Sequence, residues 1–151
     1  MKGNIKMACN NLKNRNYKSV VTAYNNTAQA YTAAGTQLNI LGNTALDAGC
    51  SIDVQGGGFK INHSGTYRIA FDVTSVPTDA GIQTLQMYNN TIAMPCASVA
   101  NTTTANGTIT QHIETTVYLP VCCNNQPVIT LNIAGVAGSV THICANATRL
   151  A

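Results

Sequence analysis

The stretch Gln55-Gly-Gly-Gly-Phe-Lys-Ile-Asn-His-Ser-Gly-Thr-Tyr-Arg-Ile-Ala-Phe-Asp-Val-Thr74 decides the fold. Apolar and polar residues alternate on both sides of the turn formed by Ser64 and Gly65. Alternation with a period of two places every second side chain on the same face of a strand. The stretch therefore predicts two antiparallel strands with one buried face. The predicted core residues are Phe59, Ile61, Tyr67, Ile69, Phe71 and Val73.

The same stretch resembles the central motif of the tumour necrosis factor and complement globular-head superfamily. A glycine-rich segment precedes Phe59 and a short strand. Gly65, Tyr67 and Phe71 follow at the positions that match the motif. In strand order, the resemblance covers residues 27–151. It implies a compact jelly roll that forms a homotrimer and binds other molecules without catalysing a reaction.

The rest of the chain is typical of short strands separated by turns, with no helical periodicity of useful length. We expect strands at 27–32, 36–41, 51–55, 59–62, 66–74, 82–89, 91–99, 108–119, 128–133 and 139–149. About eight to ten strands with no helix between them predict an all-β fold, an antiparallel jelly-roll sandwich. A chain of 151 residues is long enough for one such domain and too short for two.

The composition favours an oligomer over a monomer. Only 9% of the residues are charged and 45% are hydrophobic, so the chain is too apolar for disorder. It also lacks the charge that usually keeps a monomer soluble. We therefore expect part of the surface to be covered in an assembly.

The positive charge is concentrated near the amino terminus. The first 18 residues contain no acidic residue and hold five basic ones: Lys2, Lys6, Lys13, Arg15 and Lys18. The sequence thus predicts a basic, Asn-rich arm over residues 1–26 and a jelly-roll domain over residues 27–151. A basic arm on a nearly neutral body suggests docking onto an acidic surface, for which an assembly shell is favoured over nucleic acid. The alternative is a frayed terminus whose lysines only add solubility.

Other function classes find no support in the sequence. Lys2 and Lys6 interrupt any secretion signal, and no apolar run is long enough to span a membrane. We expect a product made in the host cytoplasm without a signal peptide. No catalytic motif is present, so we expect no enzyme, no catalytic residue and no cofactor.

The cysteines and histidines do not have the spacing of a zinc site, so no metal is expected. The alternative is a site formed by His142 and Cys144, which lie two residues apart on one strand. All six cysteines are predicted to be free thiols, because their spacing does not suggest a disulfide framework.

Two function classes stay open. The first is a structural component of a virus particle, either a phage capsid decoration or the head of a fibre or spike. In this hypothesis the arm anchors a trimer to another virion protein, and loops are exposed, some of them able to contact a host-surface glycan. The second is a bacterial surface or spore-coat adhesin head that binds a glycan or protein receptor. In either class the candidate ligand loop consists of Asn101, Thr102, Thr103, Thr104 and Asn106.

Overall fold

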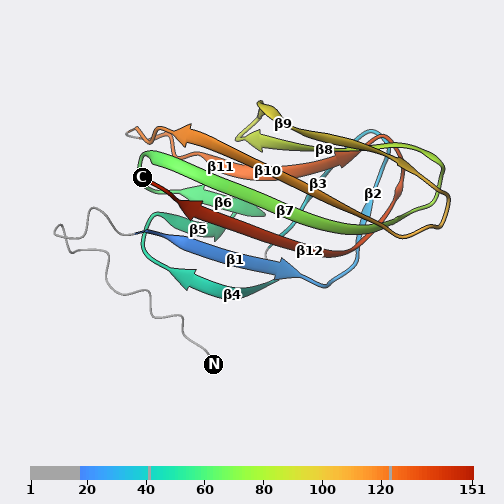
Figure 1. Ribbon diagram of the computed structural model, residues 1–151, viewed down its shortest axis with the longest axis horizontal. Helices are drawn as coiled ribbons and strands as arrows, with labels where there is room; N and C mark the ends of the chain where they lie inside the picture. Colours follow the sequence, from blue (N-terminus) through green and yellow to red (C-terminus); the bar gives the residue numbers. More distant parts are fainter. Residues whose placement is uncertain (1–17, 41, 123) are drawn as a thin grey trace.

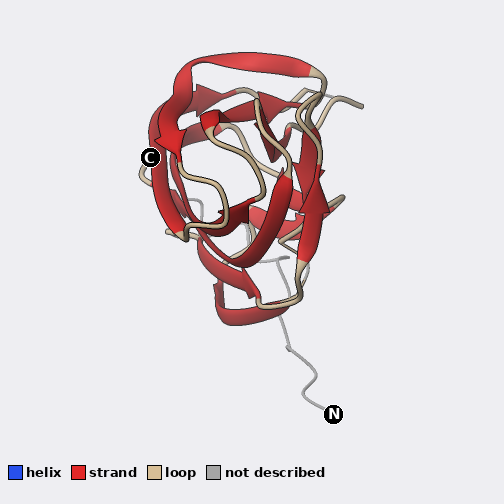
Figure 2. Cartoon of the chain, turned by 90° about the vertical axis from the view of Figure 1, so that its right-hand side faces the viewer, coloured by secondary structure: helices blue, strands red, loops and turns tan. Residues whose placement is uncertain are grey.

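The computed structural model describes residues 18–40, 42–122 and 124–151, which form two layers of antiparallel strands (Figures 1 and 2). Sheet I has the order β10 (Ile109–Leu119), β7 (Gly65–Pro77), β12 (Gly138–Arg149), β1 (Val20–Asn25) and β4 (Asn43–Ala48), and β2 (Gln29–Tyr31) also pairs with β12. Sheet II has the order β5 (Ile52–Gln55), β6 (Gly58–Ile61), β11 (Val128–Ala134), β8 (Gly81–Asn89) and β9 (Ile92–Thr103), and β3 (Thr36–Leu38) also pairs with β11. The predicted antiparallel jelly-roll sandwich is confirmed, with twelve strands among the described residues.

The core lies between the two sheets, and β7 supplies its centre. Every second residue of β7 is buried from Gly65 to Pro77, as the alternation of its sequence requires. All six residues that the sequence assigned to the core have a relative exposure of 0%. The rings of Phe59 and Phe71 meet across the sandwich, with centroids 6.0 Å apart and planes tilted by 39°.

The jelly roll begins earlier than residue 27. Strand β1 lies inside the segment that the sequence analysis assigned to the arm, and it pairs with both β12 and β4. Val21 and Ala23 are buried in the core, and Ser19 is fully buried just before the strand. The Ser19 carbonyl accepts a hydrogen bond of 2.8 Å from the Arg149 backbone N–H. Residues 20–25 therefore belong to the domain, so an arm can extend no further than residue 18.

The predicted ligand loop is also placed differently. Asn101, Thr102 and Thr103 belong to β9, and only Thr104 to Asn106 lie in the turn that follows. Thr103 is buried, and its hydroxyl donates to the Asp79 carbonyl at 3.0 Å. These residues pair with Gly81, Ile82 and Gln83 of β8. Edge pairing makes them a strand although they show no alternation of apolar side chains.

The prediction of six free thiols is wrong, because one of the cysteines that the structure describes forms a disulfide. Cys50 is disulfide-bonded, whereas Cys96 and Cys144 are free thiols. Cys9 and Cys123 lie outside the described residues.

Strand β9 contains a bulge at the edge of sheet II. Its register against β8 shifts between Gln86 and Tyr88, and Cys96 has a φ of 58°, in the left-handed region. The Gln86 side-chain amide stabilises the bulge, because its Nε2 donates to the carbonyl oxygens of Met94 and Ala97, each at 3.0 Å.

Within the part of the chain that the structure describes, no helix is long and apolar enough to cross a membrane.

Candidate interaction face

Sheet I presents a broad face away from the core, here called the outer face of sheet I. It is built mainly on β10, β7 and β12, which have 11, 13 and 12 residues. Because inward and outward residues alternate, their register lines up the outward side chains in rows across the strands. These residues are Thr110, His112, Glu114, Thr116 and Tyr118 on β10, Thr66, Arg68, Ala70, Asp72 and Thr74 on β7, and His142, Cys144, Asn146 and Thr148 on β12.

Four charged or titratable side chains meet on this face, and we call them the His112 cluster: Arg68, Asp72, His112 and Glu114. His112 lies opposite Asp72 in the register, with Nδ1 at 2.7 Å from Asp72 Oδ1. Its Nε2 lies 3.4 Å from Glu114 Oε2, and the other Glu114 oxygen pairs with Arg68 Nε. All four side chains are partly exposed, between 32% and 60%.

The electrostatics of the cluster follow from these contacts. The hydrogen bond to Asp72 raises the pKa of His112, and Glu114 raises it further. The bond from Arg68 lowers the pKa of Glu114, with a smaller contribution from His112. On β12, Cys144 lies opposite Asp72, and burial together with that carboxylate raises the pKa of its thiol. A raised pKa keeps this thiol protonated and weakly nucleophilic.

Apolar side chains accompany the cluster on the same face. Of the five exposed large hydrophobic side chains among the described residues, Tyr118 at 61% exposure and Leu46 at 47% belong to sheet I, and Leu150 at 47% directly follows β12. Tyr118 lies opposite Thr66 in the register, and the Leu150 N–H donates to the Thr66 carbonyl at 2.7 Å. Leu46 lies on β4, at the sheet edge opposite β10. A face that combines exposed apolar residues with internally paired charges is suited to contact with another protein.

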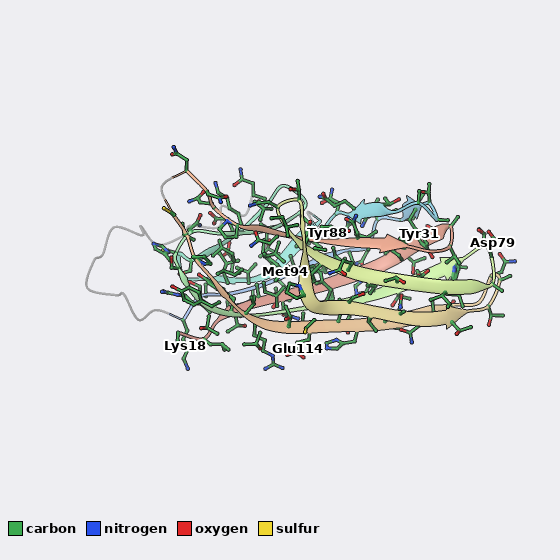
Figure 3. The ribbon with its side chains drawn as sticks, turned by 90° about the horizontal axis from the view of Figure 1, so that it is seen from above. Lys18, Tyr31, Asp79, Tyr88, Met94 and Glu114 are labelled. Atoms are coloured by element: carbon green, nitrogen blue, oxygen red, sulfur yellow. The ribbon has the colours of Figure 1, made fainter. Side chains whose placement is uncertain are left out.

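Three loops gather at one end of the sandwich, and we call them the distal loops: 78–80, 104–108 and 135–137. Backbone bonds tie them together, from the Thr78 N–H to the Ala137 carbonyl at 2.9 Å and from the Asn106 N–H to the Pro77 carbonyl at 2.7 Å. Figure 3 shows Asp79 of the distal loops and Lys18 at opposite ends of the molecule. Of the predicted ligand loop, Thr104 and Asn106 therefore lie at the end far from Lys18. The other arm residues, Lys2, Lys6, Lys13 and Arg15, lie outside the described residues.

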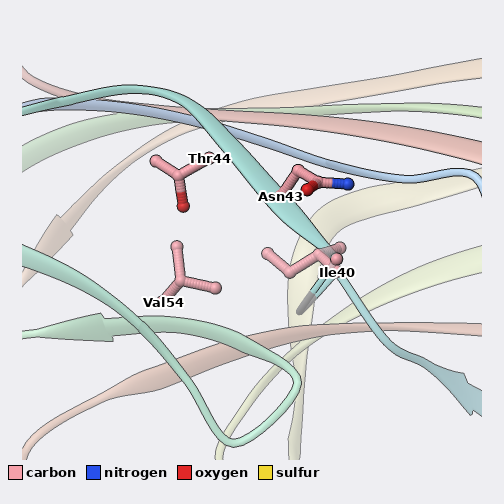
Figure 4. Close-up of a pocket in the computed structure, with 5 residues that line it drawn as sticks. Ile40, Asn43, Thr44 and Val54 are labelled. Carbon is pink, nitrogen blue, oxygen red and sulfur yellow. The ribbon is translucent and has the colours of Figure 1, made fainter. Parts of the chain in front are cut away.

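A shallow pocket of about 190 Å³ opens where β4 approaches β5 (Figure 4). It is lined by Ile40, Gly42, Asn43, Thr44 and Val54, none of which is titratable. Among the described residues, no group of three or more His, Cys, Asp and Glu side chains is arranged to hold a metal ion.

Neither a protein-family model nor a curated protein sequence matches the chain, but solved structures do. PRD1 vertex protein P5, a phage protein, superposes with a TM-score of 0.68 at 14% identity, over 88% of this chain and 97% of that one. Murine APRIL at pH 5.0 gives a TM-score of 0.65 at 13% identity, over 89% of this chain and 100% of that one. The globular domain of zebrafish complement 1qA protein gives a TM-score of 0.56 at 10% identity, over 88% of this chain and 98% of that one. The fold is that of the TNF and C1q jelly rolls.

This TNF/C1q-like jelly roll also contains a buried polar network that sequence reasoning missed. Gln83 Oε1 accepts a bond of 2.5 Å from the Tyr31 hydroxyl, and Gln83 Nε2 lies 2.9 Å from Ser75 Oγ and 2.7 Å from Gln111 Oε1. All four residues are buried. The signal was present in the sequence, because Gln83 shares its strand face with Leu85, and Gln111 shares its face with Ile113.

Proposed function

We propose that the chain is a non-enzymatic structural component of a virus particle, as a capsid decoration or as the head of a fibre or spike. The observation that carries the proposal is the superposition on PRD1 vertex protein P5, which covers 88% of this chain and 97% of that phage protein. The chain and the vertex protein thus share one complete jelly roll with little added to either. The likeness to APRIL and to the complement 1qA globular domain also favours a binding or structural role over catalysis.

The proposed assembly is a homotrimer that packs through the outer face of sheet I. Support comes from the exposed Tyr118 and Leu46 on sheet I, from the exposed Leu150 just after β12, and from a chain in which only 9% of residues are charged. Burying such side chains against another copy removes apolar area from water, which stabilises association. The TNF-like motif around Phe59 and Tyr67 agrees with a trimer, because trimers are what the resemblance implies.

In the proposed orientation the basic arm docks the head onto another virion protein. Lys18 lies at one end of the sandwich and the distal loops at the other (Figure 3). An anchor at the Lys18 end directs the distal loops, with Thr104 and Asn106, away from the particle. Loops held in that position are available to a host-surface glycan or receptor.

The experiment is to follow the protein through density gradients of intact particles. We expect it to sediment with virions at low ionic strength and to be released as salt rises, because exposed charges are screened beyond about 8 Å at physiological ionic strength. Replacing Lys2, Lys6, Lys13 and Arg15 by Gln in the full chain should release it already at low salt.

The matched control is Lys60→Gln, which removes one positive charge from β6 in the domain. This variant should remain with the particles. Absence of the parent protein from purified virions would contradict the proposed function. Salt-resistant attachment of the arm variant would place the anchor in the jelly roll instead.

A further inference from the structure

We infer that trimer assembly is coupled to proton uptake at the His112 cluster, so that the trimer is tighter at mildly acidic than at mildly alkaline pH. The inference rests on the proposed assembly through the outer face of sheet I. It adds a regulation of that contact: the face carries a group of charges whose balance depends on one proton.

The contacts define the charge balance. Asp72 and Glu114 are carboxylates that both lie within 3.4 Å of the His112 ring, and Arg68 pairs with Glu114. With neutral His112, two negative charges face a single positive one, and the cluster carries one uncompensated negative charge. With protonated His112 the positive and negative charges are equal in number.

Burial makes this difference matter. In the separate chain, water reaches every member of the cluster, because their side chains are between 32% and 60% exposed. Covering the face with a second copy removes that water, and an uncompensated charge away from water is strongly disfavoured. Burial is much less unfavourable for a cluster that holds equal numbers of positive and negative charges and whose members bond to one another. Assembly therefore favours the protonated form of His112 and raises its pKa above that in the separate chain.

Among the described residues, the neighbouring strands place no further carboxylate or cation against His112, and β12 carries one other histidine on this face, His142, which lies opposite Thr74. On β10 itself the facing group is Glu114, and on β7 the facing groups are Asp72 and, through Glu114, Arg68. Beyond β7, β12 places Cys144 opposite Asp72, where burial raises the pKa of the thiol and keeps it neutral. The strand along the other side of β10 is β9, whose sequence contains no acidic or basic residue and no histidine.

The direction of the pH effect follows by linkage. A group whose pKa is raised by assembly contributes stability that is fully present below its pKa in the separate chain. That contribution is lost as pH rises through its pKa in the assembled state. The Asp72 hydrogen bond already raises the pKa of His112 in the separate chain, so the loss should occur above the usual histidine range near ~6.5.

The test is sedimentation equilibrium of the full chain at about pH 5.5 and about pH 8, on either side of the ordinary histidine range near ~6.5. We expect the concentration for half-dissociation to rise on going to pH 8, by up to about thirtyfold for each pKa unit that assembly adds to His112, because each trimer holds three copies of this residue and the half-dissociation concentration varies as the square root of the trimer's dissociation constant. His112→Gln should assemble as weakly at acidic pH as the parent does at pH 8. Asp72→Asn should assemble tightly at both pH values, because Glu114 and Arg68 then balance without a proton.

The matched control is His63→Gln in the exposed turn before β7, which should keep the pH dependence of the parent. A trimer of equal strength at both pH values, or one that loosens on acidification, would overturn the inference and leave the proposed trimer standing. A chain that is monomeric at both pH values would instead contradict the proposed trimer and the inference together.

Discussion

Phe71 lies at the centre of β7, fully buried, with its ring 6.0 Å from that of Phe59. Replacing it by Ala removes most of a buried ring and leaves a cavity between the sheets. Such truncations cost about 3–5 kcal/mol, a large part of the stability of one domain. We expect Phe71→Ala to lower the free energy of unfolding by that amount, or to yield insoluble protein, as measured by urea denaturation.

The control for this truncation is Ile92→Ala. Ile92 is 72% exposed at the start of β9, so its truncation should change the free energy of unfolding by less than about 0.5 kcal/mol. Equal melting of Phe71→Ala and the parent would show that the inward face of β7 has been assigned to the wrong side.

The disulfide at Cys50 gives a second test at the residue scale. Thiol titration in denaturant without reductant should count two fewer thiols than the six cysteines of the sequence. After reduction the count should reach all six. Six reactive thiols before reduction would contradict the bond. The error in prediction arose because cysteine spacing along the chain does not report which residues the fold brings together.

The two sheets are joined near the distal loops by the polar network around Gln83. Gln83 on β8 bonds to Ser75 and Gln111 of sheet I and to Tyr31 of β2. Gln83→Ala removes the bonds that its side chain makes to these buried partners, at a cost of about 1–3 kcal/mol for each group left unsatisfied. We expect lower stability in urea and faster amide hydrogen exchange in the distal halves of β7 and β8.

Gln55→Ala, at an exposed position of β5, is the matched control and should unfold like the parent. If Gln83→Ala also unfolds like the parent, water replaces the lost bonds and the network does not fasten the sheets.

The elements differ in how far their sequences predict them. Strands β7, β8, β10, β11 and β12 face the core, and burial imposes an alternation that can be read directly. By contrast, β4 lies at an edge and is largely exposed, so no alternation marks it. The far end of β9 was taken for a loop for the same reason. Only part of the His112 cluster could be predicted from the sequence. His112 and Glu114 share a strand, but Arg68 and Asp72 join them through the pairing register of β7 with β10.

At the scale of the whole molecule, the proposed trimer makes Leu46 a contact residue. Leu46→Asp places a charge on the outer face of sheet I, at a position 47% exposed in the separate chain. We expect a folded monomer, since an exposed substitution costs the single chain little, while a buried unpaired charge opposes assembly. Light scattering would report the mass of the particle in solution directly.

Ile92→Asp is the matched control, because it introduces the same charge on β9 of sheet II. It should keep the mass of the parent. If both variants retain that mass, the copies meet through another surface, and a parent that is monomeric at micromolar concentration would contradict the trimer itself.

The bulge in β9 has a consequence for colloidal behaviour. β9 ends sheet II, and a straight edge strand is a template onto which other chains can add and grow into aggregates. Cys96 in its left-handed conformation breaks that template, Pro95 beside it offers no N–H, and Gln86 occupies the carbonyls of Met94 and Ala97. This chain has few charges that could repel other copies. The bulged edge strand therefore supplies the protection against fibre formation that charge supplies in other proteins.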